Sequence, residues 1–233
     1  MAERPMLMPH PVPEAYHGLW QRTHLERDAG STLTSGREER VFWLQTAHWH
    51  CDLRIPVERP DFSGVSSLDA CDDGQLAFIA GQDAFCGVTK VEGTICTWLR
   101  LHDLRPGTAL DVGRVAFRSP DFLVETGVGE SYLEHWERVE GSKGPTGISA
   151  GSDGAFVLQA GRFSMRVRPR GPAPRDLDAY GDGGAGPDLP RAHRLWVVSL
   201  EISLIADGVA ILSTHPWLEN LAFEPNGELP PCA

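Results

Sequence analysis

The 233-residue sequence lacks a long hydrophobic run and has few basic side chains. No apolar stretch approaches the ~20 residues that a membrane-spanning helix needs. The Pro-rich start, residues 1–13, has no apolar segment of the kind that marks a secretory signal. Lys and Arg number 21 against 32 Asp and Glu, so the formal charge is −11. Because nucleic acids and anionic membranes are bound through clustered basic residues, this charge argues against both as partners.

Paired cysteine motifs are also absent. The five cysteines are Cys51, Cys71, Cys86, Cys96 and Cys232, an odd number with no C-x-x-C pair. This usage suits neither a disulfide framework nor a structural zinc site. We expect free thiols that act as small buried hydrophobic groups, in a reducing, cytoplasmic compartment.

The common catalytic signatures are absent or lack their structural context. The sequence contains no Walker loop, and the G-x-S-x-G spacing at residues 147–151 has no strand–turn–helix context that would make it a nucleophile elbow. The glycine-rich run at residues 181–186 has the G-x-G-x-x-G spacing, but it lies in a polar stretch and indicates a loop. Neither a serine hydrolase nor a nucleotide-binding enzyme is indicated, and we expect no organic cofactor.

Short segments with strand character fill most of the chain, separated by turn signals such as Glu92-Gly93 and Asp207-Gly208. They are residues 18–25, 40–55, 88–91, 94–102, 113–118, 122–126, 131–139, 155–160, 163–168, 195–205 and 209–213. This pattern predicts an all-β fold, a single antiparallel barrel of about eight to ten strands. A barrel of that size either fills its interior or holds one small ligand.

The remaining segments complete the predicted domain organisation. Residues 1–15 are expected to form a flexible arm, residues 16–224 one barrel domain, and residues 225–233 a tail. A Gly- and Pro-rich loop is expected at residues 169–192. After Ser67, an apolar stripe that ends at Gly81 predicts one or two short helices covering an open barrel end.

The segment from Phe42 to Pro56 is the richest in chemistry. Alternation along one strand places His48, His50, Asp52 and Arg54 on a single face. The opposite face carries Trp43, Gln45, Trp49 and Cys51. Inside a barrel the first face would form a polar cluster with shifted pKa values, whereas facing water it would be an ordinary solvated surface. The sequence leaves both open, because a bulge would exchange the faces.

Two further strands combine aromatic and charged residues on one face. The first carries Trp98, Arg100 and His102, and the second carries Tyr132, Glu134 and Trp136. Aromatic walls with a few polar groups are typical of a ligand cavity, where a buried Glu134 would have a raised pKa. The alternative places Tyr132 and Trp136 on a rim, with Glu134 paired to Arg100 or Arg54.

The His48-x-His50 pair raises the question of a metal. Two histidines on one strand can bind one divalent ion if a neighbouring strand supplies a third ligand. The cupin pattern is not met, because the next glutamate, Glu58, lies beyond Pro56. A metal site therefore remains an alternative carried by a short motif.

Gly18-Leu19-Trp20 resembles the Gly-x-Trp that opens the first strand of calycin barrels, the group that includes lipocalins. Residues 41–46, 52–56 and 134–136 resemble bacterial calycin-like proteins without an assigned function. In calycins the Trp closes the barrel base and packs on an Arg from a late strand. Candidates for that Arg are Arg162, Arg166 and Arg168. The resemblance implies a calycin-like barrel with a cavity for a small, largely apolar molecule.

Three hypotheses for the function follow. The first is an enzyme of the lyase, hydratase or isomerase class that uses general acid–base chemistry without a cofactor. Its catalytic residues would be Glu134, Asp52, His48 and His50, and its substrate-binding residues Arg54, Arg100, Trp98, Tyr132, Trp136 and Gln45. The second is a calycin-type binding protein for an apolar ligand, or for haem held by His48, His50, His102 or His135. The third is a metal-dependent enzyme that uses His48 and His50. The expected partner is a small apolar or aromatic molecule, and a homodimer stays open.

Overall fold

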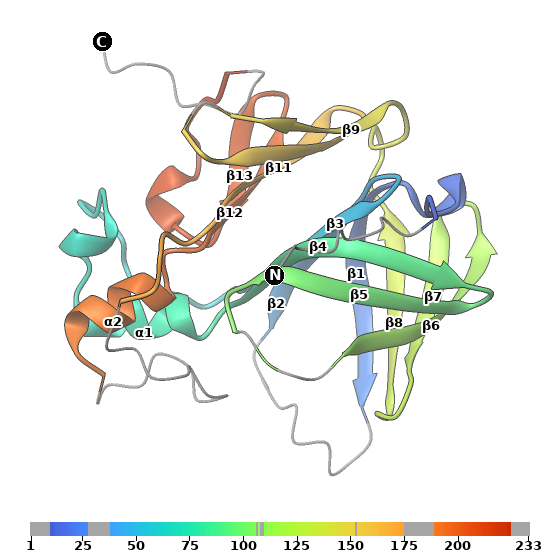
Figure 1. Cartoon of the computed structure of the whole chain (residues 1–233), viewed down its shortest axis with the longest axis horizontal. Helices are drawn as coiled ribbons and strands as arrows, with labels where there is room; N and C mark the ends of the chain where they lie inside the picture. The colour runs from blue at the N-terminus through green and yellow to red at the C-terminus, as the bar shows by residue number, and fades with distance from the viewer. Residues whose placement is uncertain are drawn as a thin grey trace, which may run out of the picture.

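The computed structural model describes residues 10–27, 38–105, 107, 110–151, 153–174 and 189–224 (Figure 1). Eight consecutive antiparallel strands form a closed barrel, in which β8 pairs with β1. The barrel strands are β1 (Gly18–Arg27), β2 (Glu39–Gln45), β3 (Trp49–Pro56), β4 (Asp83–Glu92), β5 (Ile95–Asp103), β6 (Asp111–Ser119), β7 (Phe122–Gly127) and β8 (Tyr132–Arg138). The prediction of an all-β antiparallel barrel with few helices is confirmed.

A second sheet of five strands lies beside the barrel (Figure 1). Its strands are β9 (Thr146–Ala150), β10 (Phe156–Ala160), β11 (Phe163–Arg168), β12 (Glu201–Ala206) and β13 (Val209–Ser213), in the order β13-β12-β11-β10-β9. The expectation that the later strands continue one barrel is corrected. Because β8 already pairs with β1, the barrel has no free edge to which β9 could add.

The two sheets share one hydrophobic cluster. Outward-facing side chains of β3, such as Leu53 and Ile55, are buried in it together with Leu158 of β10 and Leu204 of β12. The outer face of β3 is therefore apolar because it is covered by the second sheet, while its inner face points into the barrel. Cys51, Cys71, Cys86 and Cys96 are free and buried, as predicted, whereas Cys232 lies outside the described residues.

A tight turn divides the long strand expected at residues 40–55 into β2 and β3. Within the turn, the Thr46 N–H donates to the carbonyl of Trp49, and the Trp49 N–H donates to Thr46 Oγ1. In the resulting register Trp43 lies opposite Asp52 and Gln45 opposite His50. Since directly opposed residues project to the same side of a sheet, Trp43 and Gln45 join His50, Asp52 and Arg54 on the inner side. Trp49 and Cys51, predicted on the same face as Trp43, instead lie in the cluster between the two sheets.

The structure contains five short described helices. They are η1 (Glu14–Tyr16), η2 (Leu68–Ala70), α1 (Asp73–Ala80), α2 (Arg191–Val197) and η3 (Pro216–Leu218). Asp72 caps α1 in a capping box with Gln75, whereas Ser67 makes no side-chain cap. Leu76 and Ile79 of α1 and Val197 of α2 join the cluster between the sheets, not the cluster inside the barrel. No described helix has the length and apolarity needed to cross a membrane.

The described part of the N-terminal arm is folded against the barrel. The Val12 N–H donates to the carbonyl of Ala47, and Val12 and Tyr16 are buried in the same cluster as Trp20 and Trp43. Residues 10–15 are thus not a loose arm, because they cover the barrel end at which β1 begins (Figure 1).

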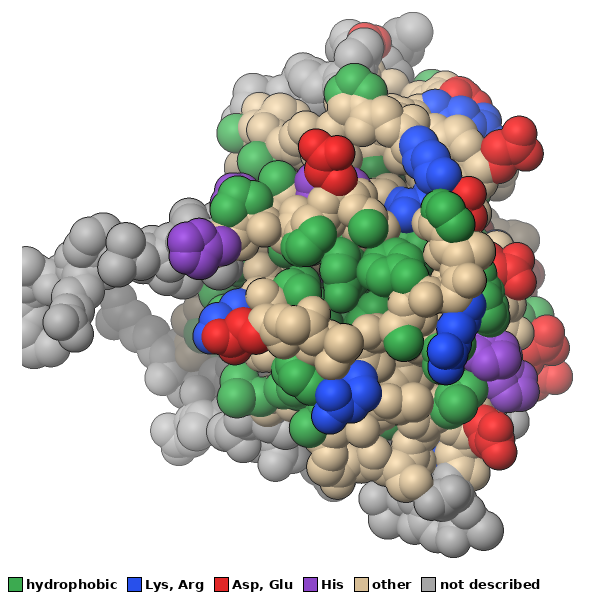
Figure 2. All heavy atoms as spheres, turned by 90° about the vertical axis from the view of Figure 1, so that its right-hand side faces the viewer, with side chains coloured by type: hydrophobic (Ala, Val, Ile, Leu, Met, Phe, Trp, Pro, Cys, Tyr) green, Lys and Arg blue, Asp and Glu red, His purple; other side chains and the backbone are tan. Residues whose placement is uncertain are grey.

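The barrel side of the molecule shows hydrophobic side chains gathered in a central hollow, with charged side chains around it (Figure 2).

Among the later segments, β9 was not predicted from the sequence, and one predicted strand begins as a helix. Residues 195–197, expected at the start of a strand, belong to α2, and β12 begins at Glu201. The described end of the predicted loop is tied down by Arg170, whose guanidinium donates to the carbonyls of Asp103, Leu104 and Val197. Residues 1–9, 175–188 and 225–233 lie outside the described residues.

The arginine that packs on Trp20 comes from β8. The Arg138 guanidinium carbon lies 4.1 Å from the centre of the Trp20 ring. The candidates named from the sequence are corrected, since all three lie on or next to the second sheet. There Arg162 lies over Phe163, and Arg166 forms an ion pair with Glu201.

Candidate functional site

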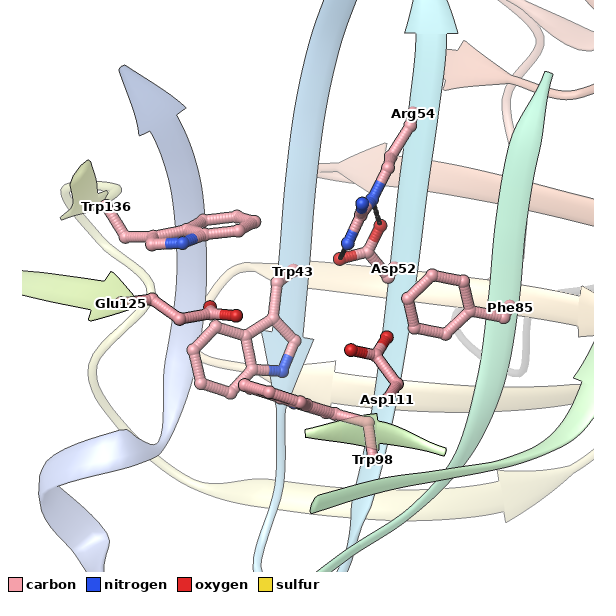
Figure 3. A pocket seen from close by; sticks show the side chains of 8 residues that line it. All are labelled: Trp43, Asp52, Arg54, Phe85, Trp98, Asp111, Glu125 and Trp136. Carbon is pink, nitrogen blue, oxygen red and sulfur yellow. Dashed lines mark hydrogen bonds and ion pairs between the residues drawn. The ribbon is translucent and has the colours of Figure 1, made fainter. Parts of the chain in front are cut away.

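A pocket opens inside the barrel, and every strand from β2 to β8 contributes to its lining (Figure 3). The lining residues are Trp43, Asp52, Arg54, Phe85, Trp98, Asp111, Glu125 and Trp136. The space not filled by atoms is about 230 Å³, including the open mouth. With the side chains in these positions, the pocket has room for about one water molecule. The chemistry of this pocket depends on how its charged groups are paired.

Tryptophans form the apolar wall of the pocket. The ring of Trp43 meets Trp98 edge-on at 5.6 Å and Trp136 edge-on at 5.9 Å between ring centres. Behind it, Trp20 stacks on Trp43 at 6.2 Å. Such edge-to-face packing of large rings holds the wall in a fixed shape.

Asp52 and Arg54 form an ion pair at one side of the pocket. Arg54 Nε lies 2.7 Å from Asp52 Oδ1, and a second nitrogen donates to the other carboxylate oxygen at 3.4 Å. Burial raises the pKa of Asp52 to about 6, although the Arg54 charge acts in the opposite direction. Asp52 thus changes its protonation state closer to neutral pH than an exposed aspartate does.

Arg100 contacts three residues in the neighbouring part of the lumen. Its guanidinium donates to Asp111 at 2.6 Å and to Asp103 at 3.3 Å. Its central carbon lies 3.5 Å from the centre of the Phe85 ring. The interactions of Arg100 therefore fix both Phe85 and Asp111, two of the lining residues.

Glu125 is the carboxyl group in the pocket that lacks an arginine partner. Its Oε1 accepts a hydrogen bond from the Tyr132 hydroxyl at 2.8 Å, and no basic side chain of the described chain forms an ion pair with it. Glu125 lies directly opposite Glu134 in the β7–β8 register. Burial and the Glu134 charge raise the pKa of Glu125 well above its ordinary value. Gly113 leaves the room for this side chain, since a β-carbon there would lie 2.7 Å from Glu125 Oε1.

Glu134 itself is engaged in an ion pair. Arg22 donates to Glu134 at 2.7 Å and to Glu39 at 3.2 Å. The sequence left a pair between Glu134 and an arginine open as an alternative. Such a pair is present, but the partner is Arg22 of β1, not Arg100 or Arg54. The reason lies in barrel closure, which brings β1 beside β8.

His50 and Gln45 belong to a buried hydrogen-bond network beside the pocket. The Thr89 hydroxyl donates to Gln45 Oε1 at 2.8 Å, and its oxygen lies 3.0 Å from His50 Nδ1. Because the Thr89 proton is already used, His50 Nδ1 must carry the proton of this contact. Burial, followed by the Arg100 charge, lowers the pKa of His50 to about 3. His50 is therefore neutral at physiological pH.

The other histidines lie away from the pocket. His48 sits in the β2–β3 turn. A bulge between Cys86 and Gly87 places His102 opposite Cys86, on the outer face, where its ring lies 5.5 Å from Phe156. In the described chain no three His, Cys, Asp or Glu side chains are arranged to hold a metal ion, so His48 and His50 have no third ligand there. The haem alternative named His48, His50, His102 or His135 as the axial ligand, and none of these four is among the eight lining residues.

The sequence candidates lie at different distances from the pocket. Asp52, Arg54, Trp98 and Trp136 line it. Arg100 and Tyr132 bind its carboxyl groups, and Glu134 lies opposite Glu125 on the neighbouring strand. Gln45 and His50 lie in the adjoining network, and His48 lies in the turn. Sequence reasoning missed Trp43, Phe85, Asp111 and Glu125. The alternation Leu123, Glu125, Gly127 along β7 carries a signal for Glu125, although only the β7–β8 register shows which face is inside.

Comparison of the chain with protein-family models, with curated proteins and with solved structures finds no match in any of the three. The functional argument therefore rests on the geometry of the pocket.

Proposed function

We propose that the barrel lumen binds a small molecule and transfers protons to and from it, as a cofactor-independent lyase, hydratase or isomerase does. The observation that supports this is the presence of two carboxyl groups, Asp52 and Glu125, in one aromatic pocket under different electrostatic conditions. Pairs of titratable groups whose environments separate their pKa values are the usual arrangement for general acid–base catalysis.

Each group has a role that follows from its partners. Glu125, buried opposite Glu134 and without a cation, retains its proton and is suited to donate it as the general acid. Asp52, paired with Arg54, is ionised above pH 6 and is suited to accept a proton as the general base. Arg54 also lines the pocket, where its charge can stabilise an oxyanion that develops on the substrate.

We also propose that the protein is a calycin-like barrel. The up-and-down order of the eight strands and the stacking of Arg138 from β8 on Trp20 support this assignment. The Gly-x-Trp at residues 18–20 then has the packing partner that the resemblance implies. Since the barrel architecture alone does not fix a reaction, the functional proposal depends on the pocket residues.

Hydrogen exchange into a substrate tests the catalytic proposal without knowledge of the product. The wild-type protein is incubated in D₂O with a panel of hydroxy, keto, unsaturated and phenolic compounds, and deuterium incorporation is followed by NMR. We expect incorporation into at least one compound, and a loss of at least 100-fold in Glu125→Gln and in Asp52→Asn.

Glu137→Gln is the matched control, because Glu137 is exposed on the outer side of β8 and should leave the exchange rate unchanged. A compound that binds in the lumen without exchange would favour the second function, a non-catalytic carrier or sensor. Exchange that persists in both pocket variants would contradict the assigned roles of Glu125 and Asp52.

A further inference from the structure

We infer that the pocket accepts a small organic cation that also carries an oxygen atom able to accept a hydrogen bond. This inference rests on the proposed lumen site and narrows its ligand to one chemical class. It is argued from the pairing of charges, from the indole rings on which no basic side chain of the described chain stacks, and from one buried N–H group.

Carboxyl groups outnumber basic groups around the pocket. The carboxyl side chains in the connected ion-pair and hydrogen-bond contacts are Glu39, Asp52, Asp83, Asp103, Asp111, Glu125 and Glu134. The basic partners in the same contacts are Arg22, Arg54 and Arg100. Each of these arginines already contacts at least one carboxylate, whereas Glu125 contacts none of them. An anion would therefore have to break an existing ion pair, whereas a cation would stabilise the ionised form of Glu125, which has no basic partner in the described chain.

The aromatic wall also favours a cation. The Arg100 guanidinium already lies on the Phe85 face, so this environment stabilises a cation on a ring. In the described chain no basic side chain stacks on Trp43, Trp98 or Trp136. Indole rings give the strongest cation–π attraction, and these three rings lie together around the unfilled space (Figure 3).

The buried N–H group of Trp136 is the reason to expect an oxygen atom on the ligand. Its side chain is 2% exposed, and its Nε1 has no hydrogen-bond partner among the described residues. Figure 3 shows this nitrogen on the edge of the ring that faces Glu125 and the space above Trp43. An indole N–H only donates, and leaving it unpaired in a buried site costs about 1–3 kcal/mol. A hydroxyl or carbonyl oxygen on the ligand would satisfy this group.

A series of three compounds with one branched skeleton tests the inference by titration calorimetry at pH 8. Choline carries the positive charge and a hydroxyl, 3,3-dimethylbutan-1-ol is its neutral counterpart, and 3,3-dimethylbutanoate is an anion of similar size. We expect choline to bind at least tenfold more tightly than the alcohol, and the carboxylate to show no measurable binding.

Two variants test whether Glu125 and Trp136 contact the ligand. In Glu125→Gln the advantage of choline over the alcohol should fall to threefold or less, while the alcohol binds as before. In Trp136→Phe, which keeps a ring but removes the N–H, both compounds should bind more weakly by about the same factor. Circular dichroism confirms that each variant is folded, and the comparison within the wild-type protein does not depend on either variant.

The outcomes separate this inference from the proposed function. Equal binding of choline and the alcohol would overturn the cation preference and leave the lumen site in place. Tightest binding of the carboxylate would also overturn it and would identify an arginine as the ligand contact. If none of the three binds, the cation inference is overturned, whereas the lumen site fails only if the exchange panel is also inactive. Choline binding with no deuterium exchange in the panel would support the cation site and count against catalysis.

Discussion

The side chain of Glu125 lowers the stability of the barrel and also provides a group that can donate a proton. It lies directly opposite Glu134, and like charges at directly opposed strand positions destabilise a sheet. Asp111 adds a further negative charge nearby, and the charge of Arg54 offsets the raised pKa only in part. The fold therefore holds this carboxyl group in its neutral form, which is the form needed to donate a proton.

This arrangement predicts a pH-dependent gain in stability for Glu125→Gln. A carboxyl group whose pKa is raised by folding contributes stability below its ordinary pKa, and that contribution is lost as the pH rises through the raised pKa. We expect the variant to match the wild type near pH 4 and to melt several degrees higher at pH 8, as measured by calorimetry.

Glu137→Gln, on the exposed side of the neighbouring strand β8, should show no such gain. A Glu125→Gln protein that is less stable than the wild type at pH 8 would show that Glu125 is ionised there and contributes to stability in that form.

At the scale of elements, turns and bulges decide which side chains meet. The turn between β2 and β3 brings Trp43 beside Asp52, and the bulge between Cys86 and Gly87 moves His102 to the outer face while Arg100 remains inside. The bulge requires a glycine, because a β-carbon at position 87 would lie 1.9 Å from the carbonyl oxygen of Leu99. The backbone of β5 approaches too closely to accommodate any side chain.

Gly87→Ala should therefore lower the free energy of unfolding by about 3 kcal/mol or more, since backbone atoms on both strands must move. Gly147→Ala in β9 is the matched control, because its β-carbon would meet nothing within 4 Å. Its effect should stay within about 0.5 kcal/mol. Urea unfolding measures both variants, and equal stabilities would show that the bulge is not held by this close approach.

At the scale of the whole molecule, the barrel and the second sheet depend on each other. Leu53 and Ile55 on the outside of β3 are fully buried in a cluster that includes residues of β10 and β12. Removal of the second sheet would expose a large apolar surface on a barrel whose interior is partly occupied by charged groups. We therefore expect the two sheets to unfold as one cooperative unit.

Leu204→Ala on β12 tests this coupling. The substitution should cost about 2–5 kcal/mol, as buried leucine truncations do, and should lower the melting temperature of the barrel equally. In a background that carries Trp196→Phe and Trp217→Phe, near-ultraviolet circular dichroism follows the barrel through its buried residues Trp20, Trp43 and Trp136. Far-ultraviolet signals follow both sheets.

Ile148→Ala on β9, a position that is 48% exposed, serves as the control and should change the melting temperature little. Two separate transitions in Leu204→Ala, with the tryptophan signal melting last, would show that the barrel is stable without the second sheet.

The sequence by itself determined the features that depend on neighbouring residues. Strand alternation and turn signals predicted an all-β fold, and the hairpin turns at Glu92-Gly93 and Asp207-Gly208 are present. Both residues of the second turn have positive φ, 49° at Asp207 and 82° at Gly208, which this turn type needs. Asp52 and Arg54 could be singled out because they share one face of a single strand.

Only the tertiary structure decided the features that depend on distant pairings. Closure of the barrel between β1 and β8 brought Arg22 to Glu134 and left the later strands to form their own sheet. The β7–β8 register placed Glu125 in the lumen, and the β2–β3 register did the same for Trp43. A local pattern shows which residues share a face, but whether that face points inward depends on register and closure, which are set by contacts between residues far apart in the chain.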